Sequence, residues 1–270
     1  MNNSTAVSQL PLIDAHIHLD SYTVTQQALL LQEMPAAGVE SVVAVSMHLA
    51  SCQQNYRLAQ QFPGRIHTAF GYHPEQELPT EAQLKELFQW MEAHHEAMIA
   101  VGEVGLPYYA RQEAVEAGTP FHQQPYIDLL EQFIQFAQRH SKPVILHAVY
   151  DDAAIACDLL QQYQIERAHF HWYKGDTNTT QRMADLGYFI SFTPDIVYEE
   201  EIQALAKWYP PAQVMAETDG PWPFEGPFAN QLTHPAMTRE VVAAWAALQG
   251  IDPLEAGSLL YSNTKRFYSL

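Results

Sequence analysis

Six side chains of the types that bind metal ions lie at or just beyond the ends of segments predicted to be buried strands. Alternate side chains of a strand point to the same face, so the two imidazoles of a His-x-His segment can reach one divalent ion. Six such side chains are too many for one tetrahedral ion and suit two ions bridged by a carboxylate. The six residues are His16, His18, Glu103, His147, His171 and Asp219.

The spacing of these residues along the chain suggests a role for each of them. Glu103 is the expected bridge, with His16, His18 and Asp219 completing one ion and the two remaining histidines completing the other. Two divalent cations against two carboxylates leave a positive site that favours an anionic oxygen and acidifies a bound water. We expect Asp219 to be the catalytic general base. We expect Asp14, deeper in the same segment, to orient a ligand histidine.

The elements that must position these residues alternate along the chain as strands and helices. Eight parallel strands with intervening helices form a (β/α)8 TIM barrel, so the predicted fold class is α/β. We predict a single domain over residues 11–270, preceded by an N-terminal extension over residues 1–10. The predicted strands cover residues 12–16, 41–46, 66–71, 98–103, 143–147, 168–171, 188–191 and 214–217.

Alternation within the predicted strands gives each candidate ligand an inward-facing position. In the first strand Asp14, His16 and His18 share the face opposite Ile13, Ala15 and Ile17. His169 falls one layer below His171, and we predict that it is a buried core residue.

Polar helices and long loops separate the strands. Helices are predicted over residues 80–95, 122–140, 236–249 and 252–260, where apolar residues recur at helical spacing. The longest irregular segments follow strands, at residues 72–79, 106–120 and 220–235, and such loops lie on the catalytic face of a barrel. The segment 106–120 is either a floppy insertion or a lid or pocket wall.

The composition excludes several classes of protein. Thirteen Lys and Arg against 31 Asp and Glu give a formal net charge of −18, which disfavours a broad nucleic-acid surface. The two cysteines, Cys52 and Cys157, lie in helix-like segments and predict reduced thiols without a disulfide framework. The first residues do not read as a signal peptide and no apolar run reaches the length of a membrane span, so we expect a cytoplasmic protein without membrane association. No obligate protein partner is indicated.

Motifs in a fixed order resemble the TatD family of metal-dependent hydrolases, within the amidohydrolase-like barrels. The resemblance covers nearly the whole chain and implies a (β/α)8 barrel, two divalent ions at the six residues named above, and hydrolysis, often of phosphodiesters in DNA. It also implies that His73 faces the substrate. The motifs are Ile13-Asp-Ala-His-Ile-His-Leu-Asp20, Gly71-Tyr-His-Pro74, Gly102-Glu-Val-Gly-Leu106, Pro143-Val-Ile-Leu-His147, His169-Phe-His171, Glu217-Thr-Asp219, and Asn263 before Arg266-Phe267.

Three departures from the family pattern affect the expected substrate. Pro107 replaces the usual Asp after the fourth-strand motif, Val149 replaces an Arg that could clamp a phosphate, and Gly220-Pro221-Trp222 follows the last motif. Lys174 could supply a replacement positive charge. An aromatic rim that could hold a base or another ring is predicted from Tyr108, Tyr109, Trp172, Tyr173, Trp222 and Phe224.

Three functions follow from these observations. The first is hydrolysis of a phosphodiester, as in a deoxyribonuclease, with a small molecule or short nucleic acid as substrate. The alternative is a metallohydrolase acting on a lactone, amide or small phosphoester, and the third is a non-catalytic metal-binding barrel. A Rossmann oxidoreductase is disfavoured because no Gly-x-Gly-x-x-Gly follows the first strand. His and carboxylate ligands accept Zn, Mn, Ni, Co or Mg, and we expect zinc.

Overall fold

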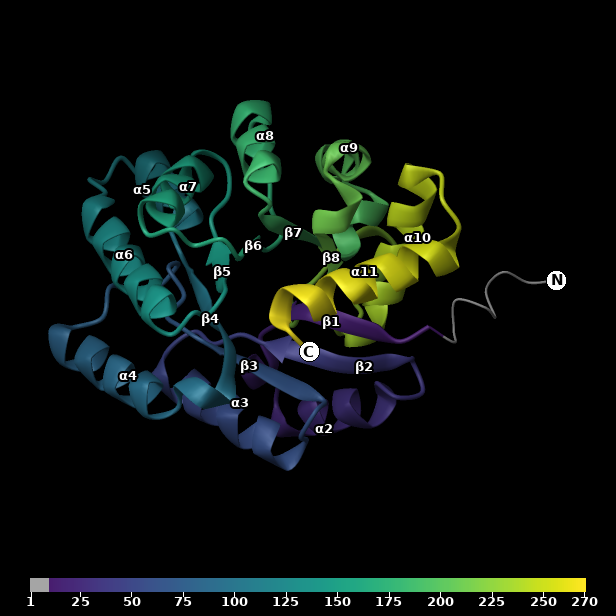
Figure 1. Ribbon diagram of the computed structural model, residues 1–270, viewed down its shortest axis with the longest axis horizontal. Helices are drawn as coiled ribbons and strands as arrows, with labels where there is room; N and C mark the ends of the chain where they lie inside the picture. The colour runs from purple at the N-terminus through teal and green to yellow at the C-terminus, as the bar shows by residue number, and fades with distance from the viewer. Residues whose placement is uncertain (1–9) are drawn as a thin grey trace. The chain divides into compact units, whose positions relative to one another are not determined.

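The computed structural model describes residues 10–270, in which strands and helices alternate (Figure 1). The strands belong to one sheet and follow chain order from β1 to β8. Neighbouring pairs within it, such as β4 with β5, are parallel. Residues 1–9 of the predicted N-terminal extension lie outside the described residues, so its boundary stays a prediction. The strands are β1 (Leu12–Ile17), β2 (Val39–Ala44), β3 (Ile66–Phe70), β4 (Met98–Gly105), β5 (Val144–His147), β6 (Ala168–Phe170), β7 (Phe189–Phe192) and β8 (Val214–Ala216).

Helices connect the strands, as parallel pairing requires. In residues 10–270 no helix has the length and apolar character needed to cross a lipid bilayer. Short 3-10 turns precede β4 and β8, at His95–Ala97 and Pro211–Gln213. The α-helices are α2 (Val24–Glu33), α3 (Leu49–Gln61), α4 (Glu81–Ala93), α5 (Tyr108–Glu116), α6 (Gln124–Arg139), α7 (Asp151–Gln162), α8 (Thr177–Asp185), α9 (Glu200–Trp208), α10 (Thr238–Gln249) and α11 (Pro253–Tyr268).

The chain divides into two compact units, and we describe each by itself. The first unit comprises the chain up to Ala44, Arg57–His67 and Ile190–Leu270, and the second comprises Val45–Tyr56 and Thr68–Phe189. Strands β1, β2 and β8 therefore belong to the first unit, and β4, β5 and β6 to the second. Helix α3 and strands β3 and β7 run from one unit into the other.

In the first unit, α10 and α11 pack against each other and against β1 (Figure 1). Helix α11 begins at Pro253 behind Asp252, whose side chain accepts a hydrogen bond from the backbone of Leu254, a favourable N-terminus. Asn263 in this helix donates from Nδ2 to the carbonyl oxygens of Pro211 and Val214, at 2.8 Å each. The family motif residue Asn263 therefore anchors α11 to the start of β8.

In the second unit, α6 covers β4 with an apolar stripe at helical spacing. Leu130, Phe133, Ile134 and Ala137 of this stripe are buried. Every residue of β5 is buried, as expected for a parallel strand covered on both faces. Helix α4 begins with a capping box in which the side chains of Thr80 and Gln83 each accept from the other's backbone N–H.

The segment 106–120 differs from its sequence-based prediction. We expected an irregular segment, but Tyr108–Glu116 form α5. The residues of α5 include good helix formers such as Ala, Arg, Gln and Glu, whereas Pro107 at its N-cap makes no side-chain capping bond. The last helix, predicted over residues 252–260, is also longer than expected and continues to Tyr268.

Candidate metal centre

The first unit brings together three of the predicted ligands. The Nε2 atoms of His16 and His18 lie 3.3 and 3.4 Å from Oδ1 of Asp219. One potential ligand atom from each residue lies within 4.8 Å of the other two. The backbone holds this arrangement, because the N–H of Asp219 donates to the carbonyl of His16 at 2.9 Å and that of His18 to Gly220 at 2.8 Å. The three residues thus form a compact group of potential metal-binding atoms.

Asp14 is buried, and it contacts the predicted ligand His16 through the backbone and not through the imidazole ring. Its Oδ1 accepts hydrogen bonds from the backbone N–H groups of His16 and Thr218, and its Oδ2 accepts one from the hydroxyl of Thr218. Burial, together with the nearby charge of Glu217, raises the pKa of Asp14 well above its usual range despite these bonds. Asp14 therefore ties β1 to the segment after β8 through the backbone, which fixes the ligands indirectly.

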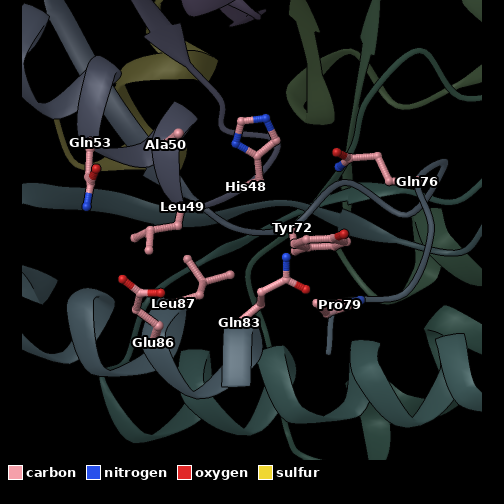
Figure 2. A pocket seen from close by; sticks show the side chains of 10 residues that line it. All are labelled: His48, Leu49, Ala50, Gln53, Tyr72, Gln76, Pro79, Gln83, Glu86 and Leu87. Atoms are coloured by element: carbon pink, nitrogen blue, oxygen red, sulfur yellow. The ribbon is translucent and has the colours of Figure 1, made fainter. Parts of the chain in front are cut away.

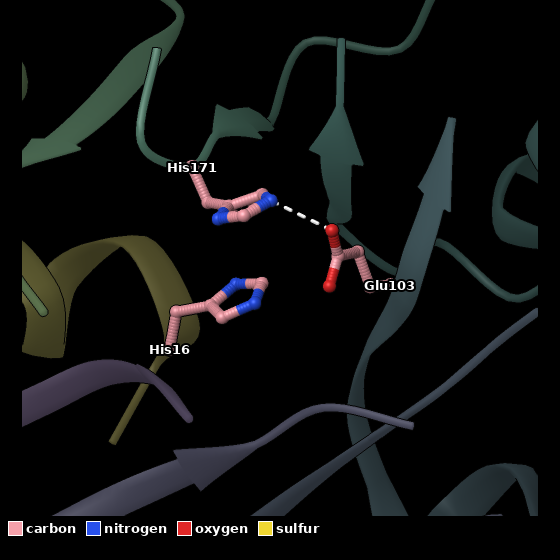
Figure 3. Close-up of side chains that lie close together, drawn as sticks. All are labelled: His16, Glu103 and His171. Atoms are coloured by element: carbon pink, nitrogen blue, oxygen red, sulfur yellow. Dashed lines mark ion pairs between the residues drawn. The ribbon is translucent and has the colours of Figure 1, made fainter. Parts of the chain in front are cut away.

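The second unit gathers a further group around the carboxylate of Glu103. Its Oε1 lies 3.0 Å from Nδ1 of His147, 2.6 Å from Nε2 of His171 and 3.3 Å from Nε2 of His73. Figure 3 shows the ring of His171 directed at this carboxylate from just beyond the end of β6. Glu103 is fully buried. A buried carboxylate among several imidazole nitrogens has the ligand chemistry that a divalent transition metal prefers.

His73 lies in this group, although the family resemblance placed it only toward the substrate. Its backbone N–H donates to the carbonyl of Met47 at 3.0 Å, which fixes the start of the loop after β3. Its ring lies 4.9 Å from that of His147, centroid to centroid. The imidazole of His73 therefore lies within hydrogen-bond distance of the carboxylate of Glu103.

Glu75 is a member of this group that the sequence reasoning missed. Its Oε1 lies 3.2 Å from Nε2 of His147, and its carboxylate accepts hydrogen bonds from the backbone N–H groups of Tyr109 and Ala110 at 2.9 and 2.8 Å. Burial alone would raise the pKa of Glu75, but the bonds from His147 and from the two amides outweigh it and lower that pKa. The signal available was its position two residues after His73.

The same contacts affect His147. Burial alone would lower the pKa of this imidazole, but hydrogen bonds with Glu103 and Glu75 outweigh burial and raise it. His147 is thus held between two carboxylates, one on each ring nitrogen.

A close approach of two backbones positions His147. A Cβ atom added to Gly105 at the end of β4 would lie 1.9 Å from the carbonyl oxygen of His147. That same oxygen accepts the N–H of Leu106 at 2.9 Å. The Gly102-Glu-Val-Gly-Leu106 motif therefore needs glycine at its fourth position so that β4 and β5 can meet beside the histidine.

The residues predicted to contact the substrate have varied surroundings. Trp222 lies in a turn closed by its backbone N–H on the carbonyl of Asp219, and it is 57% exposed, as a substrate contact requires. The ammonium of Lys174 lies 5.7 Å from the ring centroid of Trp172, a cation–π contact that directs it to an aromatic face. Val149, at the position of the family's arginine, is buried.

The predicted aromatic rim is smaller than expected. Tyr173 is buried and its hydroxyl forms a hydrogen bond with the hydroxyl of Thr180 at 3.0 Å, and Phe224 is also buried, so the prediction was wrong for these two residues. Both pack inside their units, where an aromatic ring contributes to the core. Tyr109 is 46% exposed and its ring lies 6.0 Å from that of His147.

A cavity of about 400 Å³ lies in the second unit along the loop after β3 (Figure 2). Tyr72, Gln76 and Pro79 of this loop line the cavity. In the same loop, His73 contacts Glu103 and Glu75 contacts His147. Residues of this one loop therefore belong both to the candidate metal centre and to the wall of the cavity. The remaining lining residues are His48, Leu49, Ala50, Gln53, Gln83, Glu86 and Leu87.

The chain is similar to a known protein family over nearly its whole length. A family model described as "TatD related DNase" matches residues 13–269. A protein of Haemophilus influenzae named an uncharacterized metal-dependent hydrolase is 36% identical over 262 residues, which cover 96% of this chain and 100% of the relative. The human protein named deoxyribonuclease TATDN3 is 29% identical over 218 residues, which cover 78% of each chain.

A solved structure shows the same fold. The Escherichia coli TatD homologue YJJV superposes with a TM-score of 0.81 at 24% sequence identity, covering 98% of this chain and 99% of that one. Together with the parallel strand order from β1 to β8, this likeness confirms the predicted (β/α)8 fold class.

Proposed function

Because the chain belongs to the TatD family of metal-dependent hydrolases, we propose that it hydrolyses a phosphodiester with the help of two divalent ions. The observation that carries this proposal is the donor set around Glu103, in which one buried carboxylate oxygen lies within 3.3 Å of nitrogens of His73, His147 and His171. Such an arrangement fits a divalent cation because imidazole and carboxylate ligands together suit zinc, manganese, nickel or cobalt.

In this proposal each ion has its own protein ligands and the two share Glu103. His16, His18 and Asp219 would hold one ion, and His147 and His171 would hold the other. Bound there, two divalent ions would supply positive charge for an anionic substrate oxygen and would lower the pKa of a coordinated water. We expect zinc, with manganese, nickel, cobalt or magnesium as alternatives.

The chain's own residues account for proton transfer and orientation. Asp219 takes the proton of the attacking water as general base, since its carboxylate lies beside both histidines of the first group and remains slightly open to solvent. His73 orients the carboxylate of Glu103 by hydrogen bonding, because its Nε2 lies 3.3 Å from that carboxylate. Trp222, exposed beside Asp219, contacts the organic part of the substrate.

We propose that the substrate is a short nucleic acid or a small phosphodiester rather than long duplex DNA. The name of the human relative supports phosphodiester chemistry in DNA. A formal net charge of −18 and a buried valine at the position of the family's phosphate-binding arginine both oppose an extended contact with a polyanion. The same two observations favour the second candidate, a metallohydrolase of lactones, amides or small phosphoesters.

A panel of substrates on the metal-reconstituted protein tests the proposal. It compares single-stranded DNA, an aryl phosphodiester, an aryl phosphomonoester and a lactone, each with wild type and with Asp219→Asn. We expect turnover of the aryl phosphodiester and of short DNA, and a loss of at least about 100-fold in the variant, within the usual contribution of general acid–base catalysis. Turnover of the lactone alone would replace the first candidate by the second.

Elemental analysis provides an independent test of the two-ion site. We expect two divalent ions per chain after reconstitution, and one ion per chain in a His16→Ala/His18→Ala double variant. A wild-type protein that retains no stoichiometric metal refutes the site, whatever the panel shows.

A further inference from the structure

We propose that Glu75 is a positioning residue. Its carboxylate holds the imidazole of His147 so that Nδ1 of this ring is directed at Glu103 and can serve as a metal ligand. The inference deepens the proposed function and rests on it, because it concerns the ion assigned to His147 and His171. It adds a carboxylate from the loop after β3 that neither the family motifs nor the predicted ligand set includes.

The hydrogen bonds of His147 identify its protonated nitrogen. Its Nε2 lies 3.2 Å from Oε1 of Glu75, and an ionised carboxylate only accepts, so Nε2 carries the hydrogen. With Nε2 donating to Glu75, Nδ1 is the nitrogen that would give up its hydrogen bond to Glu103 and bind a cation held there. That atom lies 3.0 Å from Oε1 of Glu103 and 3.3 Å from Nε2 of His171, inside the donor set.

The loop also distinguishes His73 from His147. The backbone N–H of Glu75 donates to Nδ1 of His73 at 3.2 Å, so Nε2 of His73 carries the hydrogen and donates to Oε1 of Glu103. Glu75 therefore orients both rings: its carboxylate accepts from Nε2 of His147 and leaves Nδ1 toward Glu103, and its backbone N–H leaves Nε2 of His73 as a donor. The structure thereby gives His147 the role of ligand and His73 that of hydrogen-bond donor.

Glu75 is itself held by the N-terminus of α5. Two backbone N–H groups of this helix, from Tyr109 and Ala110, donate to the two oxygens of its carboxylate. Such a helix terminus favours a negative charge. Because Pro107 at the N-cap offers no side-chain acceptor, the carboxylate of Glu75 supplies the cap from another part of the second unit. Helix α5 is thus coupled to a metal ligand through one side chain.

The test measures metal affinity at each site instead of turnover. Glu75→Gln keeps the size of the side chain, but its amide NH2 group replaces one of the two acceptor oxygens. It must therefore face either the backbone N–H of Ala110 or Nε2 of His147, and that hydrogen bond is lost. Glu77→Gln is the matched control, because Glu77 is an exposed glutamate two residues further along the same loop. Dissociation constants of both ions are measured by competition with a chromophoric chelator, using zinc, for wild type, the two variants and Glu75→Ala.

We expect one of the two ions to bind 10- to 100-fold more weakly in both Glu75 variants, in the range found for residues that orient metal ligands, while the other ion and the Glu77→Gln control match wild type. Cobalt-substituted protein should show a changed visible spectrum for the weakened site alone. Unchanged affinity at both sites, or an equal loss at both, overturns the inference. If the wild-type protein binds no zinc, the proposed function is refuted instead. This result is obtained before any variant is compared.

Discussion

Replacement of Asp152 by asparagine should change how the stability of the protein depends on pH. The carboxylate of Asp152 is fully buried near the start of α7, where its Oδ1 accepts from Nη2 of Arg111 at 2.9 Å and from Nε2 of Gln123 at 2.7 Å. Burial, which outweighs the attraction of Arg111, raises the pKa of Asp152 from 3.8 to about 6. Between these two values the folded protein binds more protons at this position than the unfolded chain does.

The sign and size of the effect follow from this difference. Because the folded state holds the proton more tightly, the contribution of Asp152 to the free energy of unfolding is largest below pH 3.8 and is lost as the pH rises through 6. From pH 5 to pH 8 the loss is about 1.4 kcal/mol for a pKa shift of this size. Asparagine does not titrate, so Asp152→Asn should gain about that much stability relative to wild type on going from pH 5 to pH 8.

Urea unfolding, followed by tryptophan fluorescence, gives the free energy of unfolding of the variant and of wild type at pH 5 and at pH 8. The prediction concerns how the difference between the two proteins changes with pH. Asp151→Asn is the matched control, since Asp151 also pairs with Arg111, at 2.7 Å, but its side chain is largely exposed. The difference between this control and wild type should change much less between pH 5 and pH 8, because the control keeps the buried carboxylate of Asp152 and exposed pairs contribute little. If Asp152→Asn and wild type differ by the same amount at both pH values, Asp152 does not titrate as the structure requires.

Two further predictions concern packing. Gly105→Ala should destabilise the protein by about 1–3 kcal/mol and reduce its metal content, because the added Cβ would meet the carbonyl of His147; a urea midpoint and zinc stoichiometry equal to wild type would contradict this. Cys52 and Cys157 are both buried, and burial raises the pKa of Cys157 to about 12, so a thiol reagent at pH 8 should label neither in the native protein and both after denaturation. Rapid labelling of the native protein would count against the buried positions.

The sequence predicted the strands and the residues at their ends because both depend on short-range patterns. A strand alternates its faces with a period of two, so His16 and His18 had to share a face whatever surrounds them. The structure indeed brings both beside Asp219 and, in the other unit, brings His147 and His171 beside Glu103. That these residues bind metal stays a prediction.

The features that sequence reasoning missed depend on contacts between distant segments. Helix α5 has its N-terminus capped by Glu75, 34 residues away from Tyr109, so no local capping signal precedes it. The burial of Tyr173 comes from its packing against Phe170 and its bond to Thr180, neither of which an aromatic residue in a loop reveals. Propensity and spacing describe a segment, whereas caps and burial are properties of its neighbours.

Different side chains of the loop after β3 contact the candidate metal centre and line the cavity. His73 contacts Glu103 and Glu75 contacts His147, while Tyr72, Gln76 and Pro79 line the cavity. Substitutions of a cavity-lining side chain such as Tyr72 leave the side-chain contacts of His73 and Glu75 in place. The side chains that line the cavity can therefore be redesigned without replacing the residues that contact Glu103 and His147.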